Sequence, residues 1–259
     1  MKSKLLLFFI VLFSSIIGVY VLIKNRTPNH DSTTLVVGTA AGYAPFVSLD
    51  VHGEYEGFDI DIAHALAISL DKRLVIKDLG SMTSLVMALE QGSIDAIIWG
   101  MSITQDRLKK FSMVHYQGAN TTSYPLLFWQ KIPAGITNLA EMRGKTICVE
   151  PASSQSTFLN KHSDIKTMSV ERIDDALLNI QYGKADAALV DPAIAKKFKN
   201  KFPELLSLEI PLDTQDQVHG VGIMIKKENS ALITSIEQAV AGLERTGMIK
   251  DCEKKWGLE

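Results

Sequence analysis

The chain has 259 residues, of which 46% are hydrophobic and 22% are charged, and its formal net charge is −2. This composition supports one or two packed lobes and excludes an intrinsically disordered chain. The first thirty residues hold four basic groups and no acid, which leaves 23 basic and 29 acidic residues beyond them, a balance of −6. An acidic balance offers no electrostatic footprint for nucleic acid, so we expect no nucleic-acid partner.

A basic start and a long apolar run open the chain. Lys2 and Lys4 precede the run from Leu5 to Ile23, and this pattern is typical of an export signal. About nineteen apolar residues can just span a bilayer, whereas a removed signal peptide has a shorter core. No small-x-small cleavage site follows Ile23, and no Cys lies near it to take a lipid. Residues 1–30 are therefore predicted to be a signal anchor or a cleaved signal peptide plus a polar tether, with anchoring by residues 5–23 the favoured alternative.

Strands and helices alternate after the tether. Apolar residues recur at helical spacing over residues 59–70, and a second helix stops before Gly92. Short apolar and β-branched runs lie between them. This alternation predicts a parallel α/β sheet. The predicted elements are a strand over 35–39, a helix over 59–70, a strand over 74–76, a helix over 83–90 and a strand over 94–99.

Two segments of the chain echo each other. Residues 89–98 (LEQGSIDAII) parallel residues 180–189 (IQYGKADAAL), and in both a helix stops at Gly before a buried strand begins with Asp-Ala. The Gly suits a left-handed helix cap and the Asp suits a turn, so we assign neither a ligand role. The two strands deliver the chain to Trp99-Gly100 and to Asp191. Because open α/β sheets bind ligands beyond the carboxyl ends of their strands, both ends are predicted to face a shared cleft.

Two motifs carry most of the chemical information. Residues 57–63 (GFDIDIA) open a helix with two acids in its first turn, where they complement the positive end of the helix dipole. Residues 100–107 (GMSITQDR) end an apolar strand in a loop of small residues and start a helix that carries Arg107. Free backbone N–H groups and a planar guanidinium both point at this place, which suits a bound carboxylate.

Together the two motifs resemble the bacterial solute-binding proteins that feed amino-acid ABC importers. The resemblance covers residues 35 to 257 and includes GTAAGYAPF at 38–46 and Asp186-Ala187 leading to Asp191. It implies an α/β fold of the two-lobed periplasmic-binding-protein class (type II), with hinge-linked lobes and a central ligand cleft. The implied division is residues 33–123 with 217–259 (lobe 1) and residues 124–216 (lobe 2). Strands over 124–129 and 218–225 would cross between the lobes, and one last helix over 230–255 would belong to lobe 1.

The chain has two cysteines, Cys148 and Cys252. An exported protein with two cysteines invites a disulfide. In the implied fold, however, the two residues lie in different lobes, so we expect both to be packed free thiols.

The resemblance also assigns parts of a free amino acid to residues. Arg107 matches the carboxylate clamp, because its planar fork can hold both oxygens. Ser102 and the N–H of Ser154 would bind the same carboxylate. Asp191 would bind the ammonium group together with the backbone carbonyl of Gly100. Structural alternatives stay open: a surface ion pair for Arg107, and helix or turn capping for Ser154 and Asp191.

Three further residues are predicted to surround the ligand's side chain, namely Tyr43, Met82 and Trp99, unless they are simply core. Many relatives that take basic or amide ligands carry an acid or amide where this chain has Ala40. Glu150 is an unusual acid near the cleft that would replace the missing charge. We therefore expect a polar amino acid, with arginine, lysine and glutamine as the candidates.

The function that follows is the substrate-binding component of an ABC importer. The lobes would close over the amino acid by hinge motion and deliver it to a membrane permease driven by a cytoplasmic ATPase. The sequence has no phosphate-binding loop of its own. We expect an exported monomer in the periplasm or on the outer side of the inner membrane, with no cofactor, no metal and no catalytic residues. Two alternatives stay open: a cyclohexadienyl-dehydratase-like enzyme on the same scaffold, and a ligand-sensing membrane receptor.

Overall fold

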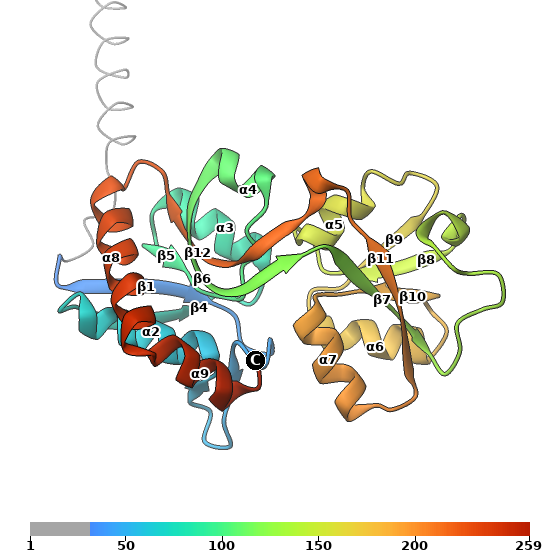
Figure 1. The fold of residues 1–259 in the computed structure, drawn as a ribbon, viewed down its shortest axis with the longest axis horizontal. Helices are drawn as coiled ribbons and strands as arrows, with labels where there is room; N and C mark the ends of the chain where they lie inside the picture. Colours follow the sequence, from blue (N-terminus) through green and yellow to red (C-terminus); the bar gives the residue numbers. More distant parts are fainter. Residues whose placement is uncertain (1–31) are drawn as a thin grey trace, which may run out of the picture.

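The structure is a computed structural model that describes residues 32–259 (Figure 1). The predicted export signal, anchor and tether at residues 1–30 lie outside the described residues. Within residues 32–259, no helix combines the length and the apolarity that a bilayer crossing requires.

Two five-stranded sheets with helices packed against them form two lobes (Figure 1). In the first sheet, three parallel strands are followed by two strands that run antiparallel to their neighbours. The predicted parallel sheet is therefore a mixed one, because the chain returns to it at its C-terminal side. The strands in spatial order are β4 (Arg73–Asp78), β1 (Thr34–Thr39), β5 (Ala96–Ile97), β12 (Val218–Lys226) and β6 (Phe111–Thr121).

The second sheet has the same mixed character. Strand β8 pairs in parallel with β9 and β10, while β7 runs antiparallel to β10 and β11. In spatial order its strands are β11 (Leu205–Pro211), β7 (Ser123–Trp129), β10 (Ala187–Leu189), β8 (Thr146–Val149) and β9 (Lys166–Ser169). A separate two-stranded hairpin in lobe 1 joins β2 (Ser48–Leu49) and β3 (Tyr55–Glu56).

The chain passes between the two sheets twice. It crosses from β6 to β7 at Thr122 and returns from β11 to β12 through a short 3-10 helix, η2 (Thr214–Asp216). These two crossings support our proposed division into lobe 1 (33–123 with 217–259) and lobe 2 (124–216).

The helices of each lobe cover its sheet. In lobe 1, α2, α8 and α9 pack together, while α3 lies against β1, β5 and β12. In lobe 2, α6 contacts β7, β8 and β10, and α7 contacts β7 and β11. The helices are α2 (Phe58–Ser69), α3 (Met82–Gln91), α4 (Gln105–Lys110), the 3-10 helix η1 (Leu139–Met142), α5 (Ser154–Leu159), α6 (Ile173–Gln181), α7 (Pro192–Lys201), α8 (Ser230–Thr246) and α9 (Met248–Trp256).

Two glycines show how local chemistry sets helix ends. Gly57 precedes α2 with φ of 134°, and a Cβ there would lie 2.1 Å from the carbonyl oxygen of Phe46. The single helix predicted over 230–255 is wrong: it is two helices, α8 and α9. Gly247 stands between them with φ of 81°, a left-handed conformation that ends α8 and starts α9.

The two similar segments, residues 89–98 and 180–189, make equivalent contacts in the two lobes. The N–H of Val36 donates to Asp95 Oδ2 at 2.8 Å, and the N–H of Thr146 donates to Asp186 Oδ2 at 2.8 Å. Each Asp therefore ties the start of its strand to the neighbouring strand through its side chain. The predicted strand over 94–99 is shorter in the structure, where β5 spans Ala96–Ile97 and the flanking N–H groups of Asp95 and Ile98 still donate to backbone carbonyls of β1.

The core of each lobe is apolar and closely packed around its sheet. Cys148 and Cys252 are both buried and unpaired, which confirms the prediction of free thiols. Burial raises the pKa of the Cys148 thiol to about 11, as expected for a packed cysteine with no reactive role.

Candidate functional site

Arg107 lies where the two lobes meet. Thr104 caps α4 by accepting a hydrogen bond from the Arg107 N–H at 3.2 Å, so the first turn of the helix holds the arginine in place. Its Nη1 donates to the carbonyl of Ser102 at 2.8 Å. Its Nη2 donates across to the carbonyl of Ala152 in lobe 2 at 3.2 Å. The guanidinium thus reaches from lobe 1 to the loop of lobe 2 that follows β8.

The side chains whose charges act on Arg107 include two candidate site residues, Tyr43 and Glu150, and no surface acid. Asp106, the adjacent acid that could have formed the surface ion pair, bonds Lys109 instead at 2.7 Å. Burial lowers the pKa of Arg107, while Tyr124, Tyr43 and Glu150 raise it. The charges of these side chains therefore act on the guanidinium, whose direct contacts are with Ser102, Ala152 and Met82.

Ser102 and Ser154 face each other across the lobes. The hydroxyl of Ser154 donates to Ser102 Oγ at 3.4 Å. Helix α5 is capped by Ser153, whose Oγ accepts the N–H of Ser156 at 3.0 Å. The capping role considered for the serine run thus falls to Ser153, and Ser154 lies beside it at the interface between the lobes.

Gly100 is held by a buried acid that the sequence analysis did not place in the site. Its N–H donates to Asp59 Oδ2 at 2.5 Å, and the hydroxyl of Tyr116 donates to Asp59 Oδ1 at 2.7 Å. Asp59 is fully buried, and burial raises its pKa to about 7 while the two hydrogen bonds lower it. Asp59 belongs to the GFDIDIA motif, for which sequence reasoning offered only the helix dipole; its main contact is with the loop that carries the predicted ligand residues.

The second acid of that motif, Asp61, ties α2 to the C-terminal tail. Its Oδ2 accepts hydrogen bonds from Lys255 Nζ and from Trp256 Nε1, each at 2.7 Å. Both acids of the first turn therefore make specific long-range contacts in addition to favouring the helix start.

The predicted side-chain pocket is partly assembled. The rings of Tyr43 and Trp99 lie 5.0 Å apart between centroids, and Trp99 Nε1 donates to the carbonyl of Ala40 at 2.7 Å. Trp99 is 4% exposed and Met82 is 6% exposed, so both belong largely to the core of lobe 1. Met82 also meets Arg107, whose Nη2 lies 3.6 Å from its sulfur.

The two acids of lobe 2 follow neighbouring strands, β8 and β10. Glu150 is 6% exposed, and burial raises its pKa to about 8, with Arg107 lowering it and Glu171 raising it. Asp191 caps α7 by accepting the N–H of Ala193 on Oδ1 at 2.9 Å. Burial raises the pKa of Asp191 to about 6. The capping role weighed for Asp191 is therefore present, and it uses one of the two carboxylate oxygens.

The model of the bacterial extracellular solute-binding proteins, family 3, matches residues 35–259. The chain belongs to this family. Family membership confirms the resemblance and the predicted solute-binding role in transport, and the enzyme alternative is wrong. The extracellular character of the family agrees with an exported chain.

Relatives of this family 3 protein include two whose names describe arginine binding. It is 34% identical over 230 residues to the "Probable ABC transporter arginine-binding protein ArtJ" of Chlamydia trachomatis serovar D, covering 88% of this chain and 87% of the relative. It is 26% identical over 223 residues to "ABC transporter arginine-binding protein 1" of Escherichia coli K12, covering 85% and 88%.

Solved structures confirm the predicted two-lobed fold. A mutant of ArgBP from T. maritima superposes with a TM-score of 0.77 at 28% identity, covering 88% of this chain and 96% of that one. An ancestral arginine-binding protein bound to arginine also gives a TM-score of 0.77, at 26% identity, covering 88% and 99%. A structure described as an ancestral arginine-binding protein bound to glutamine also gives a TM-score of 0.77.

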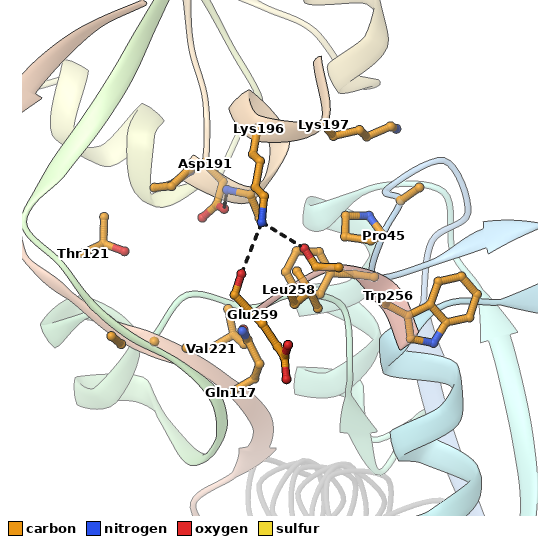
Figure 2. A pocket seen from close by; sticks show the side chains of 18 of the residues that line it. Pro45, Gln117, Thr121, Asp191, Lys196, Lys197, Val221, Trp256, Leu258 and Glu259 are labelled. Carbon is orange, nitrogen blue, oxygen red and sulfur yellow. Dashed lines mark hydrogen bonds between the residues drawn. The ribbon is translucent and has the colours of Figure 1, made fainter. Parts of the chain in front are cut away.

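A cavity of about 660 Å³ lies between the lobes of this family 3 protein beside the predicted site (Figure 2). Of the predicted ligand residues, Asp191 alone lines it. Lys196 of α7 projects into this space and donates to the carbonyls of Gly257 and Glu259, each at 3.2 Å (Figure 2). The C-terminal tail of lobe 1 is therefore fastened to lobe 2. No local sequence signal could have identified Lys196, because its partners lie about sixty residues away.

Proposed function

We propose that this protein is the substrate-binding component of an amino-acid ABC importer and that its ligand is arginine. The observation that carries the choice of arginine is the buried Glu150. Glu150 is largely buried, the charge of Arg107 lowers its pKa, and its carboxyl group has no hydrogen-bond partner among residues 32–259, while its oxygens keep some contact with solvent. Burying a carboxyl group without a donor is costly, and a ligand guanidinium would supply two donors and a positive charge.

The remaining groups divide the rest of the ligand between the lobes. Arg107 and Ser102 of lobe 1 and Ser154 of lobe 2 would hold the α-carboxylate. Asp191 would hold the α-ammonium with its second carboxylate oxygen, together with the Gly100 carbonyl. The aliphatic part of the ligand would run along Tyr43, Trp99 and Met82 toward Glu150. The relatives named for arginine binding support this choice.

Ligand capture by both lobes implies hinge closure. Each lobe supplies part of the site, so the closed arrangement gains contacts with the ligand that an open one lacks, and ligand favours closure. We propose that the closed, monomeric protein docks on a membrane permease driven by a cytoplasmic ATPase. Residues 5–23 would hold it at the outer side of the inner membrane, or would be removed to leave it in the periplasm.

A thermal-shift screen of the full-length protein against the twenty amino acids tests the proposal. A ligand that binds only the folded state raises the melting temperature by about 5–10 °C at a hundredfold excess over Kd for a domain of this size. We expect L-arginine to give the largest rise. If no amino acid raises the melting temperature, amino-acid binding is wrong; if a neutral or acidic amino acid exceeds arginine, the choice of arginine is wrong.

A further inference from the structure

A buried tyrosine hydroxyl at the meeting of the lobes has no hydrogen-bond partner. Tyr124 is the second residue of β7, just after the crossing into lobe 2. It is 1% exposed and packs edge-on against Phe158 with ring centroids 5.8 Å apart. Among residues 32–259, its oxygen is the one buried side-chain nitrogen or oxygen atom that lacks a partner. Native proteins rarely leave such a group unpaired, because its desolvation is then uncompensated.

Two of the three charged groups that act on this hydroxyl belong to the candidate site. Arg107 of lobe 1 lowers the pKa of Tyr124 and Asp191 of lobe 2 raises it, while burial dominates and raises it to about 12. The phenol is therefore protonated at neutral pH and available as a donor. Asp216, at the return crossing, also raises this pKa.

Ser154 is a polar neighbour of this hydroxyl, and the contact falls short of hydrogen-bond geometry. Ser154 is close enough to lower the pKa of Tyr124. The Ser154 Oγ is directed instead toward Ser102 Oγ at 3.4 Å and Gln155 Oε1 at 3.3 Å. The Tyr124 hydroxyl thus lies next to the serine that faces the proposed carboxylate position, with its own donor unused.

We propose that Tyr124 is a ligand-binding residue whose hydroxyl donates a hydrogen bond to the α-carboxylate of the bound amino acid. This inference rests on the proposed function. Arg107 holds the carboxylate from lobe 1, and Tyr124 approaches it from lobe 2 beside Ser154. The bond forms only with ligand present, so the hydroxyl contributes to affinity and not to the stability of the ligand-free fold.

Two Tyr→Phe variants of the full-length protein separate these roles. Tyr124→Phe removes an unpartnered hydroxyl. Tyr116→Phe is the matched control, since Tyr116 is also 1% exposed but donates to Asp59 at 2.7 Å. We expect Tyr124→Phe to leave the ligand-free melting temperature equal or higher, and to weaken L-arginine binding about ten- to hundredfold, as for loss of a hydrogen bond to a charged group. Tyr116→Phe should lower the ligand-free melting temperature.

L-argininamide tests which end of the ligand Tyr124 contacts. A neutral amide accepts a weaker hydrogen bond than a carboxylate, so Tyr124→Phe should weaken argininamide binding less than arginine binding. Equal losses for the two ligands would contradict the carboxylate assignment.

Three outcomes would overturn the inference or its premise, and they are distinguishable. A ligand-free melting temperature that falls in Tyr124→Phe as it does in Tyr116→Phe would assign the hydroxyl a structural role. An unchanged Kd in Tyr124→Phe, with the wild-type protein binding arginine, would remove Tyr124 alone from the site. A wild-type protein that binds no amino acid would overturn the proposed function itself.

Discussion

Replacing Glu150 by Gln should weaken arginine binding far more than glutamine binding. The substitution keeps the size and shape of the side chain and removes its ability to carry charge. Glu150 is 6% exposed, so a bound guanidinium would meet the carboxylate away from bulk water. A neutral ligand gains no charge pairing from Glu150 and should be little affected.

The size of the effect follows from two opposing quantities. A pair of unit charges about 4 Å apart contributes about 4 kcal/mol at the effective dielectric of a protein site. In the ligand-free protein, burial raises the pKa of Glu150 to about 8, so the group is mostly protonated near pH 7. Ionising it to meet the ligand then costs about 1.4 kcal/mol. The difference is about 2.5 kcal/mol, or roughly seventyfold in Kd.

Calorimetric titration measures this difference. L-arginine and L-glutamine are each titrated into the wild-type protein, Glu150→Gln and Glu171→Gln. Glu171→Gln is the matched control, because it removes an acid whose charge reaches Glu150 but which is exposed to solvent. We expect its affinity for arginine to stay within about threefold of wild type, as for a screened surface charge. Equal losses for both ligands in Glu150→Gln, or none, would show that Glu150 does not meet a cationic side chain.

Three more predictions follow from the site. Arg107→Ala should weaken arginine binding by about 2–5 kcal/mol, while a thermal melt of the ligand-free protein shifts little, and an unchanged calorimetric Kd would remove Arg107 from the site. Arginine binding near pH 7 should release about 0.9 proton from Glu150, whose pKa is about 8. The affinity for arginine should therefore rise as pH increases to about 8. Calorimetric titrations in buffers of different ionisation enthalpy measure the number of protons released. Burial raises the pKa of Asp59 to about 7, so the folded state binds this proton more tightly than the unfolded state does. The free energy of unfolding should therefore fall as pH rises from about 4 to 7. Urea titrations should show that Asp59→Asn reduces this fall, and an unchanged dependence on pH would contradict the prediction.

Local chemistry explains why parts of the fold could be predicted. Helix α3 was expected at 83–90 and is found at Met82–Gln91, because the Gly92 cap and the apolar spacing both lie within the segment itself. The break at Gly247 was missed, since a glycine inside an apolar periodic run can either continue or end a helix. Its left-handed conformation shows only in the packed structure.

In the candidate site too, contacts within one segment could be predicted from the sequence, whereas contacts between distant segments could not. Arg107 and Asp191 could be placed because each lies at the start of a helix that a local motif marks. The hydrogen bond from the Gly100 N–H to Asp59 joins residues 41 positions apart, and no rule of sequence spacing predicts it. The unpartnered hydroxyl of Tyr124 is likewise a property of its surroundings, because from sequence alone Tyr124 is one apolar residue in a buried strand.

Titration of the full-length protein with L-arginine near neutral pH tests the central claim most directly. We expect saturable binding at one site per chain, with a negative heat-capacity change as the lobes bury apolar surface around the ligand. Absence of binding at millimolar L-arginine, while another amino acid binds tightly, would contradict it.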